Sequence, residues 1–392
     1  MVSSTKTAST LLRARIAVAT LFLVNGMGFA TWIPHIPAAQ RKFALDEANL
    51  GLTLLAIALG AMVTMPLAGG LTARYGSRSI CIISSVAFCL MIPSLLMLSS
   101  FPLFVINLFL LGAFGGGMDV AMNAHGVYVE DQYQQPIMSS FHGMFSVGGL
   151  VGAGIAGGLL ALGWAPAQHM AVMTIVLLLL TAVASRYLLP PEPKSAGEEE
   201  PSAPLLALPR ERTMIALSGL ALFVLMAEGA MADWTTVYLE AMPGTSASLA
   251  ALGFATFSLT MAAGRLTGDA IVRALGRASV VRWGSALGMV GLLLASLSPY
   301  PYVAIVGFAL VGMGLSNIVP ILFSAAGYLS PKSPGQGIAA VTTVGYFGFL
   351  VGPPLIGLLA KLITLSGAFQ LLSVSLLLVV LSAQLVERKP SS

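Results

Sequence analysis

The feature that most constrains this chain is a series of twelve apolar runs, each about twenty residues long and bounded by charges or by Pro and Gly clusters. An apolar run of about twenty residues is long enough to cross the hydrocarbon core of a bilayer as one helix. We therefore predict an all-α membrane protein with transmembrane helices at residues 14–36, 48–71, 79–98, 101–127, 136–162, 168–189, 213–237, 247–269, 279–298, 301–327, 336–362 and 364–386.

The composition agrees with a membrane protein and argues against other classes. Hydrophobic residues make up 57% of the chain, charged residues only 9%, and the mean hydropathy is +0.91. The net charge of +4 does not indicate nucleic-acid binding, because the basic residues are scattered between the apolar runs. Cys81 and Cys89 lie eight positions apart on one run, roughly 12 Å along a helix, so they cannot bridge each other. The basic start leading into Ile16–Ile33 resembles a signal peptide, but that apolar part is long enough to span, so we expect a retained first helix.

A polar stretch at residues 190–212 divides the predicted spans six and six. It is rich in Pro and charge, which is typical of a linker, and it separates an N-terminal bundle (1–189) from a C-terminal bundle (213–392). Glycines repeat between the halves at an offset of 200, with Gly148 matched by Gly348 and Gly157 by Gly357. We therefore expect two pseudo-symmetric six-helix bundles that rock about a central site.

The basic residues predict the orientation of the chain in the membrane. With the N-terminus in the cytoplasm, sixteen of the nineteen Lys and Arg residues fall on the cytoplasmic side, and only Arg41, Lys42 and Lys361 fall outside. This asymmetry predicts a multi-pass protein of the bacterial inner membrane with both termini cytoplasmic.

The loop between the second and third spans reads Gly69-Gly70-Leu71-Thr72-Ala73-Arg74-Tyr75-Gly76-Ser77-Arg78, and the related loop in the second half contains Gly264-Arg265-Leu266-Thr267 and Gly276. The first loop resembles the signature of the major facilitator superfamily, with Ala73 at the usual Asp position. The resemblance covers nearly the whole chain and implies the major facilitator fold. It also implies a role in conformational gating for Gly69, Arg74, Gly76, Arg78, Arg265, Asp269, Arg273 and Arg277.

The fourth span is similar to a narrower branch. Gly116-Gly117-Met118-Asp119-Val120-Ala121-Met122-Asn123 resembles the acid-x-x-x-Asn pattern of the fucose permease branch, in which the acid is implicated in sugar and proton handling. We carry that role to Asp119. The branch also has an acid on the first span, where this chain has Asn25, so the resemblance does not predict fucose as the substrate. The segment Ala227–Trp234 looks like a poorly characterised bacterial subgroup of these permeases.

Four ionisable residues are candidates for proton coupling, namely Asp119, Glu228, Asp233 and His142. An acid inside a membrane span is costly unless it pairs, neutralises or faces water, which makes a functional role the first hypothesis. Asp119 and Asn123 lie one turn apart and share a face. The alternative for each acid is a structural hydrogen bond between helices. For His125 we favour such a structural role, since a histidine near a helix end is often locally bonded.

Amides and aromatic rings recognise sugars and similar solutes, so we list substrate-binding candidates of those types with the acid of the fourth span: Asn25, Asp119, Asn123, Trp32, Trp234, Asn317 and Tyr346. The tryptophans have an alternative explanation as residues of the interfacial aromatic belt. Pro320, Pro353 and Pro354 free backbone carbonyls in the tenth and eleventh spans and predict kinks or hinges there.

Together these patterns predict a secondary active transporter that moves a small polar or amphipathic solute by alternating access, most simply by symport with protons. No Walker motif or metal-site spacing occurs, so we expect gradients to supply the energy and expect no cofactor, no metal and no enzymatic activity. The expected partners are the solute, protons and the bilayer, with the protein as a monomer. Two alternatives stay open: proton-driven efflux of a lipophilic compound, which nineteen Met residues would suit, and a receptor or scaffold that does not transport.

Overall fold

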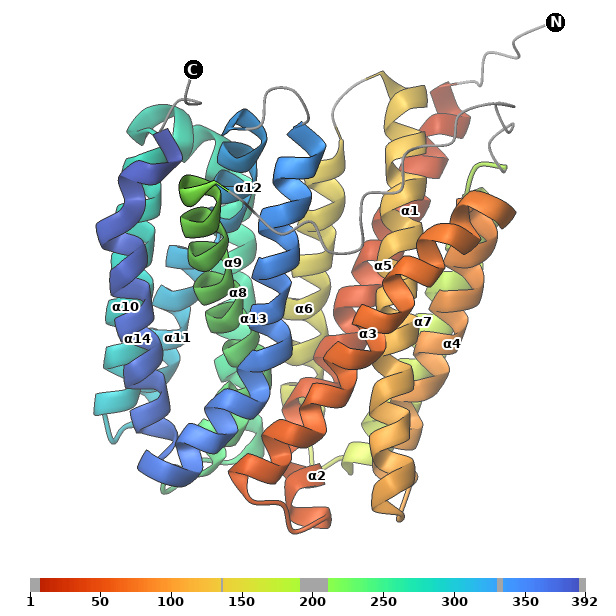
Figure 1. Cartoon of the computed structure of the whole chain (residues 1–392). Coiled ribbons are helices and arrows are strands. Elements are labelled where there is room, and N and C mark those ends of the chain that lie inside the picture. The colour runs from red at the N-terminus through yellow and green to blue at the C-terminus, as the bar shows by residue number, and fades with distance from the viewer. Residues whose placement is uncertain (1–7, 135–136, 191–210, 330–333, 388–392) are drawn as a thin grey trace, which may run out of the picture. The chain divides into compact units, whose positions relative to one another are not determined.

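The structure is a computed structural model that describes residues 8–134, 137–190, 211–329 and 334–387. All regular elements in these residues are helical (Figure 1). The first part contains α1 (Ala8–Trp32), η1 (Ile33–His35), α2 (Ile36–Lys42), α3 (Glu47–Tyr75), α4 (Ser77–Met97), α5 (Phe101–Tyr133), α6 (Met138–Ala161) and α7 (Pro166–Tyr187). The second contains α8 (Arg212–Glu240), α9 (Ala247–Leu275), α10 (Arg277–Leu297), α11 (Pro301–Leu315), α12 (Ile318–Leu329), α13 (Pro334–Ile363), α14 (Leu365–Ser382) and η2 (Ala383–Glu387).

Twelve stretches of these helices are long and apolar enough to cross a membrane, and they match the twelve predicted runs one for one. α1 to α2 and α11 to α12 each form one span, and the other ten spans come from single helices, the last with η2 appended. The prediction of an all-α membrane protein with twelve spans is therefore confirmed.

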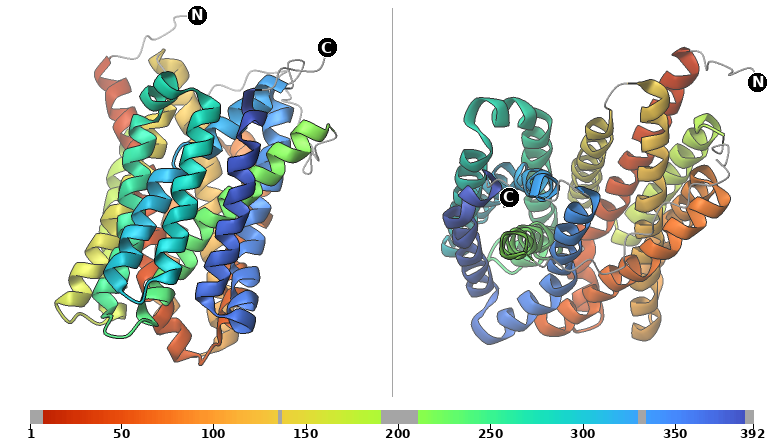
Figure 2. Two further views of the ribbon diagram at one scale, coloured as in Figure 1. Left: turned by 90° about the vertical axis from the view of Figure 1, so that its left-hand side faces the viewer. Right: turned by 45° about the horizontal axis from the view of Figure 1, so that its top comes forward.

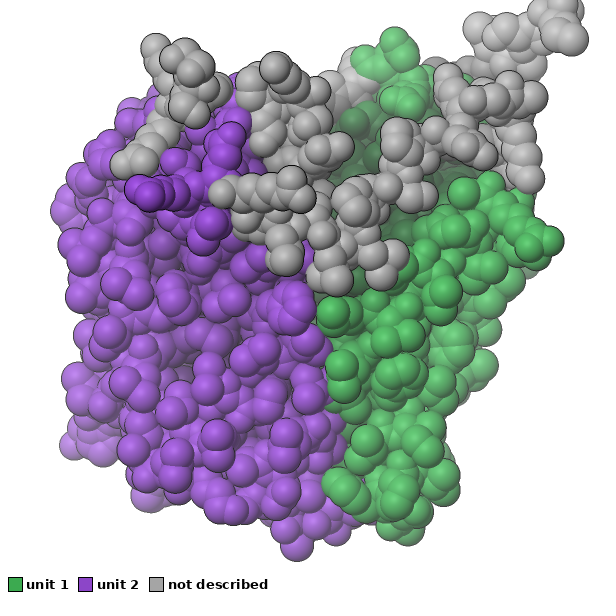
Figure 3. Space-filling view, in the orientation of Figure 1, with its two compact units in different colours: residues 1–35, 56–197 green, residues 36–55, 198–392 purple. Residues whose placement is uncertain are grey.

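Contacts divide the chain into two compact units, which Figure 3 distinguishes by colour. The first unit comprises residues 1–35 and 56–197, and the second comprises residues 36–55 and 198–392. Residues 36–55, which we call the 36–55 segment, thus group with the helices of the second half although they lie between the first two spans in sequence. Most of the predicted linker, 190–212, lies outside the described residues.

Two spans are interrupted near prolines. Pro34 lies within η1, where the first span changes from α1 to α2, and Pro320 follows the gap between α11 and α12 at Ser316 and Asn317. A proline has no N–H, so it leaves the carbonyl four residues earlier, which is that of Ser316 for Pro320, without its helical donor. Pro353 and Pro354 instead lie inside the continuous helix α13.

The boundaries of the helices repeat at the offset that the glycines predicted. α3 and α4 begin at residues 47 and 77, and α9 and α10 begin at residues 247 and 277. The residues between these helices also correspond, since Gly76 and Gly276 have φ angles of 82° and 80°. Only glycine adopts this conformation at low cost, so the same turn is made in the same way in both halves.

The most buried spans are the first and the seventh. Of the apolar window in each, 72% is buried for the span that begins with α1 and 67% for α8. α1 packs on α6 and α7 in the first unit, and α8 packs on α13 and α9 in the second, where Figure 2 shows α8 in green. The contact of α1 with α6 and that of α8 with α13 are equivalent at Gly148 and Gly348. A Cβ on either glycine would overlap a backbone carbonyl of the facing helix, that of Leu23 or that of Leu222, so both pairs of helices approach closely because these residues are glycine.

Candidate functional site

Polar side chains of the first unit gather along one face of α5. The Asn123 amide donates to the Asp119 carboxylate at 3.2 Å and to the Asp119 carbonyl at 2.8 Å. One turn earlier, the Asn25 amide of α1 donates to the carbonyl of Gly115 at 3.4 Å. Gly115, Asp119 and Asn123 are four residues apart and therefore share a face of the helix. The structure thus brings the predicted Asp119–Asn123 pair together, and the side chain of Asn25 on α1 contacts the same helix, α5.

In the second unit, an ion pair joins two spans. The Arg265 guanidinium of α9 lies 3.2 Å from Oε2 of Glu228 on α8, and the two side chains are 28% and 11% exposed. The other carboxylate oxygen, Oε1, is buried and has no hydrogen-bond partner among the described residues. A single charge in the middle of a membrane span costs about 3 kcal/mol, and pairing lowers that cost.

This pair links residues that the sequence placed in separate groups, with Glu228 predicted for proton coupling and Arg265 for gating. A signal was present in the sequence, because an acid and an Arg on consecutive spans can meet when the spans form an antiparallel hairpin. The spacing alone did not indicate that the two side chains face each other.

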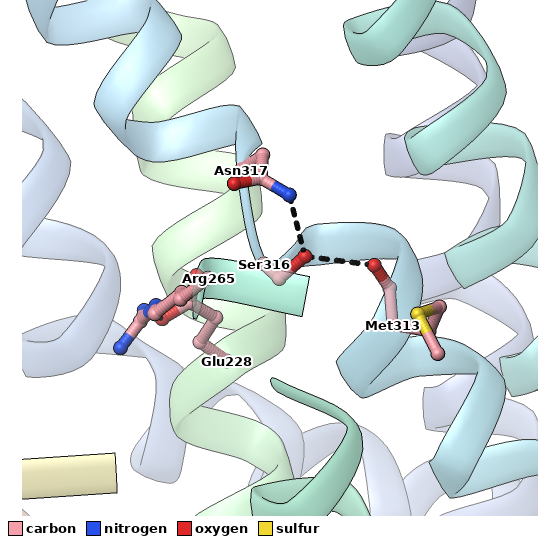
Figure 4. A network of polar contacts seen from close by, with 5 residues as sticks. All are labelled: Glu228, Arg265, Met313, Ser316 and Asn317. Carbon is pink, nitrogen blue, oxygen red and sulfur yellow. Dashed lines mark hydrogen bonds and ion pairs between the residues drawn. The ribbon is translucent and has the colours of Figure 1, made fainter. Parts of the chain in front are cut away.

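The break between α11 and α12 lies beside this ion pair (Figure 4). The Asn317 amide donates to the carbonyl of Gly264 and to the Ser316 hydroxyl, both at 3.0 Å, and Ser316 donates to the carbonyl of Met313 at 2.9 Å. Gly264 directly precedes Arg265 on α9. The break therefore places its polar groups against the turn of α9 that carries Arg265, and Ser316 is a contact that the sequence did not single out.

The two predicted tryptophans are buried inside the protein. Trp32 is 2% exposed and Trp234 is 0% exposed, and neither indole N–H has a hydrogen-bond partner among the described residues. A belt residue faces the lipid headgroups, so the alternative of an interfacial belt is wrong for both. Tyr346 is 48% exposed and lies 6.0 Å from the Phe349 ring. Substrate binding by these aromatic residues stays a prediction.

The remaining coupling candidates have different surroundings. Asp233 is half-buried on α8, and no hydrogen bond or ion pair joins it to another described residue. His142 is exposed at the start of α6, and its ring lies edge-on to that of Phe22 with the ring centroids 5.2 Å apart. His125 is buried and bonded to the Ser77 hydroxyl at 2.8 Å and to the backbone N–H of Leu189 at 3.2 Å, which supports the structural role favoured from the sequence.

The predicted gating residues lie at helix ends, apart from Gly69 in α3 and Arg265 and Asp269 in α9, which lie deeper. Arg78 donates to the carbonyl of Ser185 at 3.3 Å, and Arg74 and Arg277 lie over the rings of Tyr75 and Tyr328 at 5.1 and 4.6 Å. Space around Gly69 is open, and Arg273 is exposed. The side chain of Asp269 lies outside the described residues, so its role in gating stays a prediction.

Three further polar contacts were missed from the sequence. His35 and His169 are buried in the first unit with their ring nitrogens 2.7 Å apart. Within the second unit, the 36–55 segment forms ion pairs with α8 and α13, in which Arg41 contacts Glu240 and Asp46 contacts Lys361 at 2.8 Å. The Lys361 ammonium, with the Asn49 N–H, holds the pKa of Asp46 below its ordinary value. Pairs separated by hundreds of residues leave no local pattern in the sequence.

Comparison with known proteins gives the family. A family model described as the Major Facilitator Superfamily matches residues 18–243 and 222–392. An uncharacterised MFS-type transporter of Yersinia pestis is 40% identical over 374 residues, which cover 95% of this chain and 96% of the relative.

Solved structures agree with this fold. A D-xylose–proton symporter has a TM-score of 0.75 at 15% identity, with 97% of this chain and 98% of the other covered. The E. coli fucose:proton symporter FucP has a TM-score of 0.63 at 16% identity, with coverages of 97% and 100%. The chain therefore belongs to the Major Facilitator Superfamily, as its sequence pattern predicted, and is a multi-pass membrane transporter.

Proposed function

We propose that this protein is a proton-coupled symporter that carries a small polar or amphipathic solute across the bacterial inner membrane by alternating access. In this proposal the halves 1–189 and 213–392 rock about a central site, and 190–212 is their cytoplasmic linker. Two solved neighbours of the same fold are named as proton symporters, which supports the coupling ion.

One observation carries the proposal: each half contains a carboxylate inside an apolar span with a polar partner of its own. Asp119 lies 3.2 Å from the Asn123 amide, and Glu228 lies 3.2 Å from the Arg265 guanidinium. Intramembrane carboxylates that gain and lose a proton as their surroundings change are the usual means of proton coupling. Asp119 and Glu228 are therefore the proposed coupling residues, and Asp233 and His142 are the next candidates for this role. The residues proposed to contact the solute are Asn25, Asn123 and Asn317.

The proposed orientation places both termini in the cytoplasm. Of the three basic residues assigned to the outer side, Arg41 and Lys361 are neutralised by ion pairs with Glu240 and Asp46. The outer side is thus assigned only three of the nineteen Lys and Arg residues, in agreement with the positive-inside rule, which counts these residues whether or not they form ion pairs. Labelling a single engineered cysteine near Trp164 with an impermeant thiol reagent on whole cells tests this orientation, because that loop is assigned to the outside.

The test of function begins with finding the solute. A thermal-shift screen of the purified protein against sugars, organic acids, amino acids and drugs identifies ligands, because a molecule that binds the folded state raises its apparent stability. Uptake of the identified solute into proteoliposomes is then measured with and without an imposed pH gradient. We expect uptake by the wild type to accelerate when the outside is acidic.

Asp119→Asn is the decisive variant, and Asp131→Asn is its matched control on the same helix. Asp131 lies near the exposed end of α5, where its carboxylate is in contact with water. We expect Asp119→Asn to lose gradient-driven uptake while the control keeps it. If the rate of uptake is changed neither by the pH gradient nor by Asp119→Asn, proton coupling is rejected.

A further inference from the structure

Three helix ends of the first unit meet at one place, and each contributes an arginine. α7 packs on both α1 and α4 and ends at Tyr187. The Arg13 guanidinium of α1 lies over the Tyr187 ring, 6.0 Å from its centroid, and the Arg78 guanidinium of α4 donates to the carbonyl of Ser185 at 3.3 Å. Arg186 of α7 lies between Ser185 and Tyr187 in sequence. We call Arg13, Arg78 and Arg186 the arginine cluster.

The arginine cluster has no acidic counterpart in the part of the chain that the structure describes, because none of its members forms an ion pair there. Arg13 and Arg186 are exposed, and Arg78 is half-buried. A guanidinium has five N–H donors, and the bond to Ser185 uses one of those of Arg78. The C-terminal end of a helix carries about half a negative charge, which offsets less than one of the three cations. An anion shared by the cluster would offset the rest.

Next to the arginine cluster, α7 presents an apolar stripe to the outside of the protein. Leu179, Val183 and Tyr187 follow one another at a spacing of four, so they share a face of the helix, and they are 61%, 55% and 45% exposed. Leu12 and Ile16 of the neighbouring end of α1 are exposed as well. Exposed apolar side chains of a membrane span contact acyl chains, and tyrosines concentrate at the level of the headgroups. The arginine cluster therefore lies where headgroups begin.

We propose that the arginine cluster binds the phosphate of an anionic phospholipid whose acyl chains lie along the apolar stripe of α7. A phosphodiester carries one negative charge, and its free oxygens accept hydrogen bonds from guanidinium groups in pairs. In the proposed orientation the three helix ends are cytoplasmic, so the lipid belongs to the cytoplasmic leaflet, where clusters of Arg and Lys attract anionic lipids. The inference goes beyond the proposed transport of a solute, and only the choice of leaflet rests on the proposed orientation.

The surroundings of the cluster favour a lipid over a free phosphate ion. A free ion would be held by exposed cations in water alone, where the attraction between charges is weak and is screened by salt. A phospholipid brings its phosphate to the depth of the helix ends while its chains contact the exposed stripe. The cluster should also select against zwitterionic lipids, because these cancel the charge of the phosphate with a cation of their own.

The site is tested by titrating delipidated full-length protein in detergent and measuring lipid binding by native mass spectrometry and the midpoint of thermal unfolding. The probes are dioleoyl phosphatidylglycerol, which is anionic, and dioleoyl phosphatidylcholine, which has the same chains and is zwitterionic. Inorganic phosphate and glycerophosphoglycerol, which is the headgroup without chains, test for a free-anion site. We expect phosphatidylglycerol to bind to the wild type more tightly, and to raise its midpoint more, than the other three probes do.

Variants then locate the binding site. Each Arg or Lys near an anionic lipid raises the affinity roughly fivefold, so Arg186→Gln should bind phosphatidylglycerol about fivefold more weakly, and Arg13→Gln with Arg186→Gln about 25-fold more weakly. Arg212→Gln is the matched control, because it removes one exposed arginine at the start of α8, and it should bind like the wild type. Arg13→Lys with Arg186→Lys keeps both charges and should retain most of the affinity.

Two results would overturn the proposal. One is an affinity for phosphatidylglycerol that is the same in the wild type and in Arg186→Gln, or in the double Gln variant. The other is a midpoint shift by inorganic phosphate or phosphatidylcholine as large as that by phosphatidylglycerol. If the double Gln variant does not fold, Arg186→Gln and the double Lys variant still give the comparison.

The test is independent of transport and of orientation. If cysteine labelling near Trp164 shows the opposite orientation, the measured lipid binding stands and the lipid belongs to the outer leaflet. If phosphatidylglycerol does not bind as expected, the lipid site is rejected, while the proposed symport and its own experiment are unaffected.

Discussion

At the scale of single residues, the Glu228–Arg265 pair is a stability element as well as a candidate site. Removing one member of a buried ion pair deprives the other charge of that partner, which typically lowers stability by about 3 kcal/mol. We expect Glu228→Leu to lower the midpoint of thermal unfolding in detergent accordingly. The double variant Glu228→Leu with Arg265→Met should recover most of the loss, and a double variant as unstable as the single one would contradict this explanation.

His125 is expected to contribute to stability and not to transport. It is buried and bonded to Ser77 and to the N–H of Leu189, so it joins α5 to the start of α4 and to the end of α7. His125→Ala leaves those groups unpaired, and we expect a loss of about 1–3 kcal/mol in unfolding free energy. His142→Ala, which removes an exposed imidazole, should lower stability less than His125→Ala does. Loss of proton coupling in a folded His125→Ala protein would refute the structural role.

At the scale of elements, the α11–α12 break depends on a glycine of the neighbouring helix. A Cβ at Gly268 would overlap the side chain of Asn317, whereas a Cβ at Gly154 of α6 would meet nothing within 4 Å. We expect Gly268→Ala to displace Asn317 and reduce uptake of the identified solute at least several-fold. Gly154→Ala, the matched control, should fold and transport normally. Equal uptake by both variants would show that the contact between the break and α9 is dispensable.

The ion pairs of the 36–55 segment have a defined pH range. Because Lys361 lowers the folded-state pKa of Asp46, the pair is fully formed above the ordinary Asp pKa of about 4 and is lost only as the pH falls through the lowered value. Between about pH 5 and pH 8 its state is therefore constant. We expect Asp46→Asn to leave the shape of the pH–uptake profile unchanged over this range. A shifted profile in Asp46→Asn would place this pair in the coupling mechanism.

The elements show where sequence reasoning succeeds. Pro320 predicted a kink in the tenth span, and the helix does break, at Ser316 and Asn317. Pro353 and Pro354 predicted the same for the eleventh span, yet α13 continues through them. A helix can continue through a proline because neighbouring helices, side chains and small local adjustments satisfy the backbone groups that the proline leaves without partners. A proline alone does not show which outcome the neighbours will produce.

At the scale of the whole molecule, the sequence predicted the twelve spans and the family because both depend on local signals. Apolar runs report membrane burial directly, and Gly76 marks a turn that only glycine makes easily. The sites were predicted less completely, since Glu228 with Arg265 and His35 with His169 meet only through packing of separate helices. Asp119 with Asn123 was found because the two lie one turn apart on the same helix.

The two halves share a frame but not their chemistry. α3 and α9, and likewise α4 and α10, begin and end 200 residues apart. The acid of the first half sits beside an amide on its own helix, however, while that of the second sits beside a guanidinium on the next. The frame of these four helices has been kept to the residue, while the surroundings of the two acids differ between the halves. A chimera made of two copies of one half would therefore inherit the architecture and lack whatever the missing half performs.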